Sequence, residues 1–147
     1  MLHIIPDGMT VEINLGCPNV HRYGISQKTL KAFTRHFTTI VKLPATDLID
    51  EVANLAIMAG AHYLHCSNTL PTRRGGESGR LLREWNLPVV TRLSNRYPNI
   101  PIIAGGGIYS IDNVREYEEA GASKFSLSTA WFLPWRALKI ISEHQVK

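Results

Sequence analysis

Short apolar runs alternate with longer amphipathic segments along the chain. Five of the runs are only a few residues long and mostly apolar on both faces, which is typical of strands buried in a parallel sheet. We predict strands at residues 11–15, 40–43, 63–67, 102–104 and 125–128. Strands that alternate with helices predict βα units, so the expected fold class is α/β with a parallel sheet.

The segments between these runs carry the start and stop signals of helices. Ser26 and Ser110 are suitable N-cap residues, because a serine hydroxyl accepts a hydrogen bond from a free N–H of the first turn. Gly60 and Gly121 are expected to end two helices, since glycine readily adopts the left-handed conformation found there. Pro134 suits the first turn of a last helix, which we expect to run to about residue 143.

Two further helices are predicted from less regular patterns. Asp47 precedes an amphipathic segment whose expected buried face consists of Leu48, Val52, Leu55 and Ala59. Pro88 is disfavoured inside a helix, because it has no N–H to donate. We therefore place Pro88 in the first turn of a short helix over residues 87–97.

The size and charge of the chain exclude several classes of protein. Its 147 residues suffice for one domain with a hydrophobic core, so we expect residues 1–147 to form a single domain. The formal net charge is +4, but the lysine and arginine residues are scattered, which argues against a nucleic-acid-binding surface. A modest positive charge is compatible with a small anionic ligand, such as a phosphate or a carboxylate.

The cysteine content and the hydropathy favour an intracellular location. Cys17 and Cys66 are too few for a disulfide framework, which favours free thiols in a reducing compartment. The N-terminus lacks the pattern of a signal peptide. No run approaches the roughly 20 apolar residues needed to cross a bilayer. We therefore expect a cytoplasmic protein that binds neither membranes nor nucleic acid.

Polar, small or reactive residues follow almost every predicted strand. In parallel βα folds the carboxyl ends of the strands meet at one edge, and the loops there carry the functional groups. The candidate residues at this edge are Asn14, Cys17, Lys42, Ser67, Asn68, Thr69, Gly105, Gly106, Gly107, Ser128 and Thr129. We interpret the pattern as a functional site, because a purely structural protein has little reason to confine polarity to one edge.

Two glycine-rich stretches suggest a phosphate site. Residues 105–107 follow a strand and precede the helix capped by Ser110, where backbone N–H groups and the helix dipole favour an anion. Residues 75–79 form a second loop, which we expect to be flexible and rich in donors. Neither stretch has the sequence of a nucleotide P-loop, and each alone is more often a tight turn. Together with Ser128 and Thr129 they favour phosphate binding.

Two of the candidate residues have a structural explanation as well as a functional one. Cys17 lies in a Gly-Cys-Pro turn. Most cysteines fill space in a core, but a position in a turn makes a reactive thiol about equally probable. Lys42 ends an apolar strand and is either a solvated surface residue or a cation directed at a ligand.

A metal site at His62, His65 and Cys66 is not expected. On a strand, His62 and Cys66 share one face and His65 points to the other. A fourth ligand is also missing from this segment. We therefore predict that the protein holds no metal.

Six motifs occur in order between about residue 11 and residue 134: EINLGCPNV, VKLP, SNT, GGESG, PIIAGGGI and AGASKFSLST. Each motif alone is weak evidence for a family. The six in order resemble dihydroorotate dehydrogenase, the FMN-dependent (β/α)8-barrel enzyme of pyrimidine synthesis. The resemblance implies a partial (β/α)8 TIM barrel, with roughly the last five strands and their helices. A complete barrel typically needs about 250 residues.

The resemblance also assigns roles to residues at the strand ends. Cys17 matches the catalytic base of the family's soluble, cysteine-using branch, and Lys42 matches a lysine beside the flavin. The positions that match substrate-binding groups are Asn14, Asn68 and Thr69. The positions that match FMN-binding groups are Asn14, Lys42, Ser67, Gly79, Gly106, Gly107, Ser128 and Thr129. These roles imply an oxidoreductase that converts dihydroorotate, a dihydropyrimidine, to orotate.

The resemblance covers only the later part of the family's barrel. The family's first three strands, which supply further substrate and flavin contacts, have no counterpart here. One expectation is therefore a half or truncated oxidoreductase that works as a homo-oligomer or with a complementary N-terminal half chain. The alternative is a catalytically silent half-barrel module that binds a phosphate ligand, a flavin or a partner chain.

Overall fold

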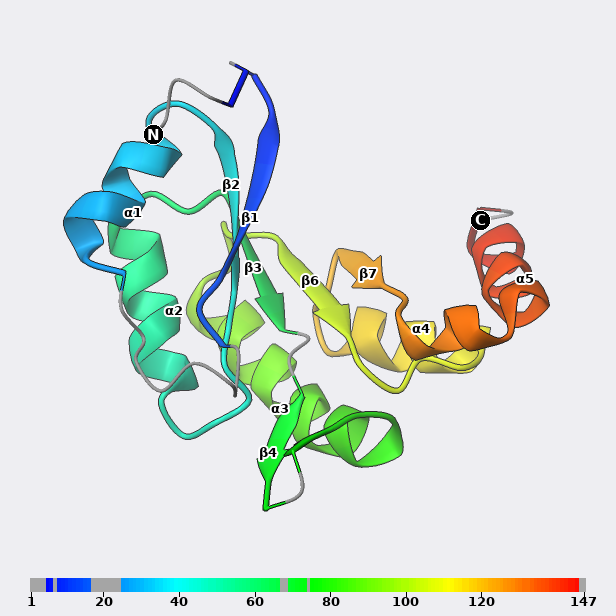
Figure 1. The fold of residues 1–147 in the computed structure, drawn as a ribbon. Coiled ribbons are helices and arrows are strands. Elements are labelled where there is room, and N and C mark those ends of the chain that lie inside the picture. Colours follow the sequence, from blue (N-terminus) through cyan, green and yellow to red (C-terminus); the bar gives the residue numbers. More distant parts are fainter. Residues whose placement is uncertain (1–4, 7, 17–24, 67–68, 74, 146–147) are drawn as a thin grey trace.

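The computed structural model is built around a parallel sheet of five strands, and it describes residues 5–6, 8–16, 25–66, 69–73 and 75–145. The strands pair in parallel in the order β1-β2-β3-β6-β7. Their bounds are Thr10–Asn14 (β1), Thr38–Lys42 (β2), Tyr63–Cys66 (β3), Ile102–Gly105 (β6) and Lys124–Ser126 (β7) (Figure 1). All five strands predicted from the sequence are confirmed, with small shifts at their ends.

Helices follow the strands and complete the βα units. Their bounds are Gln27–Thr34 (α1), Ile49–Met58 (α2), Arg80–Arg96 (α3), Ile111–Glu119 (α4) and Pro134–Gln145 (α5), with a short 3-10 helix, Thr129–Phe132 (η2), before α5. The hydroxyls of Ser26 and Ser110 each accept a hydrogen bond from the N–H three residues on, at 3.1 and 3.4 Å. Gly60 and Gly121 adopt φ angles of 89° and 98° just beyond α2 and α4. These predicted helix signals are confirmed.

Helix α3 is longer than the sequence predicted. It begins at Arg80, well before residue 87, and Pro88 lies inside it. An interior proline costs a helix about 3 kcal/mol. The side chains that α3 buries along its length offset this cost: Leu82, Asn86, Val89, Val90 and Leu93. The prediction was wrong because tertiary packing outweighs the local preference of one residue.

The buried face of α2 (Ile49–Met58) differs from the prediction except at Ala59, which is buried at the end of the helix. Leu48 precedes the helix and is 41% exposed, and Val52 and Leu55 are only half-buried. The helical side chains that are buried in the core are Ile49, Ala53 and Ala56. Alanine lets a helix approach a sheet closely, so the buried stripe is rotated toward the small residues.

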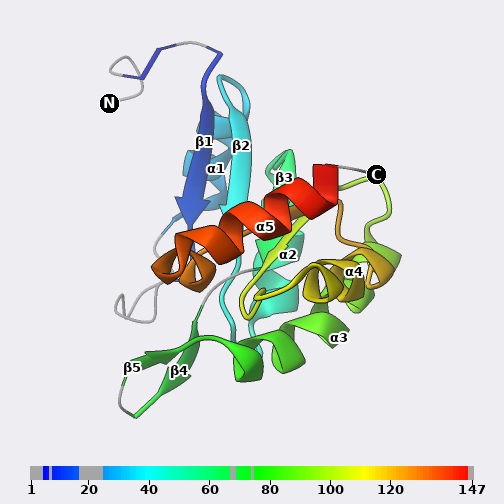
Figure 2. The same cartoon turned by 90° about the vertical axis from the view of Figure 1, so that its right-hand side faces the viewer.

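Residues 75–79, expected to form a flexible loop, lie partly in a β-hairpin. Strand β4 (Leu70–Thr72) pairs antiparallel with β5 (Gly75–Glu77). The hairpin projects beyond the carboxyl ends of the parallel strands, at the lower end of Figure 2. Proline and glycine are unfavourable in strands, and Pro71 and the glycines at 75 and 76 therefore hid the hairpin from sequence analysis.

The two faces of the parallel sheet differ in burial and chemistry. One face packs against the helices, and its buried residues include Thr39, Val41, Leu64, Cys66, Ile102 and Ala104. The second face, called the open face below, carries the alternate residues of each strand. By register these are Thr10, Glu12, Asn14, Thr38, Ile40, Lys42, Tyr63, His65, Ile103, Lys124 and Ser126. The open face is therefore largely polar.

Strand β1 shows this division most clearly. Its burial alternates residue by residue, with Val11 and Ile13 half-buried and Glu12 and Asn14 exposed. The expectation that the strands are apolar on both faces is therefore wrong for β1. Alternation of this kind is found where one face of a strand meets the core and the other does not.

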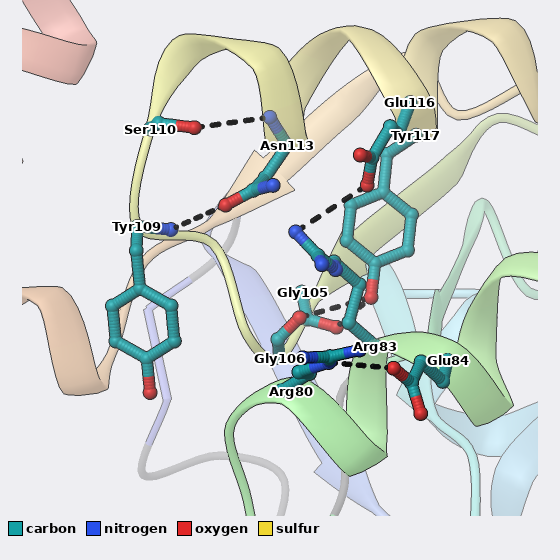
Figure 3. Close-up of polar contacts among 10 residues, drawn as sticks. All are labelled: Arg80, Arg83, Glu84, Gly105, Gly106, Tyr109, Ser110, Asn113, Glu116 and Tyr117. Carbon is teal, nitrogen blue, oxygen red and sulfur yellow. Dashed lines mark hydrogen bonds and ion pairs between the residues drawn. The ribbon is translucent and has the colours of Figure 1, made fainter.

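Two side chains from the helices hold the ends of β3 and β6. The side-chain amide of Asn86 in α3 donates to the carbonyl oxygens of Cys66 (3.1 Å) and Gly105 (2.9 Å). The hydroxyl of Tyr117 in α4 donates to the carbonyl oxygens of Gly105 and Gly106, at 2.9 and 3.0 Å (Figure 3). Asn86 and Tyr117 are both buried. They therefore satisfy carbonyl oxygens that water cannot reach.

Replacing Asn86 with alanine should lower the free energy of unfolding by about 2–4 kcal/mol, because two buried carbonyl oxygens would lose a donor. Asn95→Ala, at an exposed position of the same helix, is the matched control and should change it by less than about 0.5 kcal/mol. Urea unfolding followed by circular dichroism measures both. Equal, small changes would contradict the role given to Asn86.

Candidate functional site

The loops after β6 and β7 lie side by side at the carboxyl edge of the sheet. The two strands pair through their last residues, so the chain leaves both at the same edge. The Thr129 hydroxyl donates to the hydroxyl oxygen of Tyr109 at 3.3 Å, which links the loops directly. Four residues predicted to bind phosphate are carried by these two adjacent loops: Gly106, Gly107, Ser128 and Thr129. Their role as phosphate ligands stays a prediction.

Three glycines form a close backbone contact at this edge, which we call the glycine cradle (Gly79, Gly106 and Gly107). Their φ angles are 84°, 87° and 67°, in the left-handed region that favours glycine. A Cβ on Gly107 would collide with the carbonyl oxygen of Gly79, and a Cβ on Gly106 would stand 2.5 Å from Leu82. The start of α3 therefore lies directly against the loop after β6.

Helix α4 begins next to the glycine cradle, and a local network fixes its first turn. The side-chain oxygen of Asn113 accepts from the N–H of Tyr109 at 3.1 Å, and the N–H of Asn113 donates to the hydroxyl of Ser110 (Figure 3). The amino end of a helix carries partial positive charge and free N–H groups. This arrangement suits an anion beside the loop.

Lys42 and Asn14 lie opposite each other at the ends of β2 and β1. The Lys42 side chain is only 22% exposed, and its ammonium nitrogen lies 3.8 Å from the carboxylate of Glu12. Lys42 is thus a half-buried cation on the open face rather than a freely solvated one. The side-chain oxygen of Asn14 accepts from the N–H of Gly16 at 3.0 Å, which fixes the turn after β1.

Glu12 also binds His65, which connects three strands across the open face. The second carboxylate oxygen of Glu12 lies 2.6 Å from Nδ1 of His65, whose side chain is 5% exposed. Burial lowers the pKa of His65 below its ordinary value of 6.5, although the bond to Glu12 opposes this. The contact fits a neutral imidazole that donates from Nδ1. Its Nε2 is buried and has no hydrogen-bond partner among the described residues.

Other reactive groups of the described residues offer little further chemistry. Burial raises the pKa of the Cys66 thiol to about 12, so Cys66 is protonated and unreactive near neutral pH. In the part of the chain that the structure describes, no three His, Cys, Asp or Glu side chains gather as metal ligands would. None of the helices described here is long and apolar enough to cross a membrane.

Several predicted site residues are placed less directly. Cys17, Ser67 and Asn68 lie outside the described residues. Thr69 is half-buried at the start of the hairpin, where a Cβ on Gly76 would collide with its side chain. The structure therefore brings together the glycine cradle with the loop after β7, and separately Asn14 with Lys42, at one edge of one sheet.

Sequence analysis gave no role to several residues that shape this edge: Glu12, His65, Asn86, Tyr109 and Tyr117. A signal for Glu12 was present, because it stands two residues before Asn14 on a strand and so shares its face. Asn86 and Tyr117 act across elements distant in sequence. Nothing in the linear pattern indicates that they reach the strand ends.

Comparison with known families supports the resemblance carried by the motifs. Residues 45–145 match the family model described as dihydroorotate dehydrogenase. The chain belongs to the dihydroorotate dehydrogenase family. The matched segment runs from the loop after β2 to the end of α5 and contains the whole glycine cradle.

Curated relatives of this dihydroorotate dehydrogenase family member include two catalytic subunits of dihydroorotate dehydrogenase B (NAD(+)). The subunit from Geobacillus sp. (strain WCH70) is 31% identical over 164 residues, which cover 94% of this chain and 52% of the relative. The subunit from Listeria monocytogenes serotype 4a (strain HCC23) is 33% identical over 162 residues, which cover 90% and 52%. The chain therefore spans about half the length of these curated relatives.

Solved structures show the same relation at the level of the fold. The crystal structure of the Eimeria tenella enzyme DHODH in complex with ferulenol matches with a TM-score of 0.75 and 22% identity, over 91% of this chain and 48% of that one. The ligand-free enzyme matches with a TM-score of 0.74. The expected α/β fold, a partial (β/α)8 barrel, is confirmed.

Folding stability should fall as the pH drops below about 6.5, because the unfolded chain then binds a proton at His65 that the buried imidazole resists. Above that pH the buried neutral His65 costs no stability. The free energy of unfolding then decreases as the pH falls toward the lowered pKa of His65 in the folded state. His65→Gln should reduce this pH dependence, whereas His36→Gln, at an exposed position, should not. Urea unfolding at about pH 7.5 and about pH 5.5 measures the change in the free energy of unfolding. The same change in the free energy of unfolding between these pH values in His65→Gln and in the parent would contradict the role of His65.

Proposed function

We propose that the chain is the C-terminal portion of a cytoplasmic, FMN-dependent oxidoreductase that converts dihydroorotate to orotate. One observation carries the proposal. The glycine cradle, the adjacent loop with Thr129, and the pair Asn14 and Lys42 all lie at the carboxyl edge of one parallel sheet. Active sites of (β/α)8 barrels are built at this edge. The names of the curated relatives support the substrate.

The residues present fit the phosphate end of FMN. The glycine cradle packs its two loops closely together, and α4, whose amino end attracts an anion, begins beside it. Ser128 and Thr129 add hydroxyl groups from the neighbouring loop, and Lys42 would lie beside the flavin ring. When bound, the flavin supplies the hydride-accepting chemistry of the reaction.

The chain's own residues would bind the dihydropyrimidine and move its proton. Cys17 is the proposed base, whose thiolate takes a proton from a ring carbon within hydrogen-bond reach. Asn14, Asn68 and Thr69 would pair with the carbonyl and N–H groups of the ring, where an unmatched buried group costs about 1–3 kcal/mol. The positive charge of Lys42, held near Glu12, stabilises negative charge that develops beside it.

We propose that further strands complete the barrel by adding to the edges of the sheet. Among the described residues, β1 pairs only with β2, and β7 pairs only with β6. Unpaired edges of this kind readily accept another strand. The charged groups of the open face argue against closing it with an apolar layer. A complementary N-terminal half chain or a second copy of this chain would supply the strands.

The glycine cradle also supports a second candidate function. The chain spans about half of its curated relatives, and a half barrel that keeps the glycine cradle suits binding of a phosphate ligand, a flavin or a partner chain without turnover. The colour of the purified protein separates the possibilities. Flavin absorbance that dihydroorotate bleaches supports the oxidoreductase, whereas flavin that stays oxidised supports the silent module.

In protein that binds FMN, Cys17→Ala should slow bleaching of the flavin by dihydroorotate by roughly 100-fold or more, because the base is lost. Cys17→Ser should restore part of the rate and shift its dependence to higher pH, since a hydroxyl is a weaker acid. Stopped-flow absorbance measures this step.

Cys66→Ala is the matched control for removal of a thiol. Its thiol is buried on the helix face, so the change should lower stability and leave the bleaching rate unchanged. Bleaching of Cys17→Ala at the parental rate would assign the thiol to packing and the base to another group.

The purified chain should form a dimer or a larger assembly, or should bind a complementary half-barrel chain, because β1 and β7 present unpaired edges. Light scattering coupled to size-exclusion chromatography measures the mass. A monomer that binds FMN and bleaches with dihydroorotate would contradict the need for added strands.

A further inference from the structure

Tyr109 lies beside the proposed phosphate site, next to Gly79 and Thr129, although the family resemblance gives it no role. It follows β6 and precedes α4, and it is 36% exposed. Figure 3 shows its ring extending away from α4, whereas Tyr117 points from α4 to the buried carbonyls of Gly105 and Gly106. The two tyrosines thus serve different sides of the same loop.

The hydroxyl of Tyr109 touches both neighbouring loops. It accepts a hydrogen bond from the Thr129 hydroxyl at 3.3 Å. It also lies 3.1 Å from the point where a Cβ on Gly79 would stand, so the absence of a side chain at Gly79 leaves room for it. Three segments that are far apart in sequence, the start of α3 and the loops after β6 and β7, therefore meet at one phenolic oxygen.

The backbone of Tyr109 is held independently of its ring. Its N–H donates to the side-chain oxygen of Asn113, which is itself held by the cap of α4 at Ser110. The backbone that carries the ring is therefore already ordered, so its ordering costs little when a ligand binds. The hydroxyl is therefore carried by a segment whose backbone is tied to the first turn of α4.

Three hydrogen-bond donors of this loop have no acceptor among the described residues. The Tyr109 hydroxyl accepts from Thr129, and its own proton has no acceptor among the described residues. The backbone N–H groups of Gly107 and Ile108 likewise donate to no acceptor in the described part of the chain. One O–H and two N–H groups within three consecutive residues form a donor set that matches the several oxygens of a phosphate.

We propose that Tyr109 binds the ligand's phosphate monoester group through its hydroxyl proton, as an anion-binding residue of the proposed FMN site. The proposal rests on the proposed function and deepens it. The phenolic O–H donates to a phosphate oxygen while Thr129 continues to donate to the phenolic oxygen, so both hydroxyls are used in one chain of hydrogen bonds. Tyr109 thereby favours the phosphorylated flavin over its unphosphorylated form.

The test compares Tyr109→Phe with the parent protein for two ligands, FMN and riboflavin, which differ by the phosphate. Tyr109→Phe should weaken FMN binding about tenfold, since a hydrogen bond to a charged group is lost, and should leave riboflavin binding unchanged. Quenching of flavin fluorescence gives both dissociation constants. The Thr129–Tyr109 bond is exposed, so the melting temperature of the variant should match the parent.

Tyr97→Phe is the matched control. The Tyr97 hydroxyl is buried at the end of α3 and has no hydrogen-bond partner in the described part of the chain, so its loss should change neither dissociation constant. Binding of inorganic phosphate, followed by the shift in melting temperature, provides a readout that needs no flavin. Tyr109→Phe should reduce that shift, and Tyr97→Phe should preserve it.

The outcomes separate this proposal from the proposed function. Equal FMN affinities for the parent and Tyr109→Phe would overturn the role of Tyr109 and leave the flavin function intact. Suppose that the parent binds phosphate but no flavin, and that Tyr109→Phe binds phosphate less well. This result would support the role of Tyr109 and overturn the flavin function. A parent that binds neither phosphate nor FMN would overturn both.

Discussion

The hydrogen bonds from Asn86 and Tyr117 to the carbonyl oxygens at the ends of β3 and β6 fix the geometry of the carboxyl edge at these two central strands. They join α3 and α4 to the strands at the point where the chain turns into the loop of Gly106 and Gly107. Burial raises the pKa of the Tyr117 hydroxyl above its ordinary value, so it stays a donor over the whole physiological range. The backbone contact between Gly79 and Gly107 depends on this fixed frame.

The open face shows how one carboxylate can organise a charged surface. Glu12 reaches from β1 to Lys42 on β2 and to His65 on β3, so a single negative charge serves two basic groups. Neutral His65 leaves the positive charge of the cluster on Lys42, nearest the functional edge. A face of this composition suits the lining of a barrel with a polar ligand better than a contact with an apolar layer.

Local signals predicted much of this architecture. The five strands, the N-caps at Ser26 and Ser110, and the adjacency of the loops after β6 and β7 follow from hydrophobic period, capping chemistry and the rule for parallel strand ends. The early start of α3 and the rotated face of α2 were missed, because packing overrides the preferences of Pro88 and Leu48. The hairpin was missed because its residues have poor strand propensity. At the site, the bond between Glu12 and His65 spans 53 residues, and no local pattern reports a contact of that range.

The order of the sheet has a consequence for how the chain acquires its structure. Each parallel strand pairs with the parallel strand that precedes it along the chain, with only the small hairpin between β3 and β6. Every new βα unit emerging from a ribosome therefore finds its pairing partner already made. Each pairing still spans a whole βα unit, as between Thr10 and Thr38 or Leu64 and Ile102, so a long loop must close first and folding is slower than in a helical bundle. The sheet can grow by adding one unit at a time in the direction of synthesis, from β1 to β7.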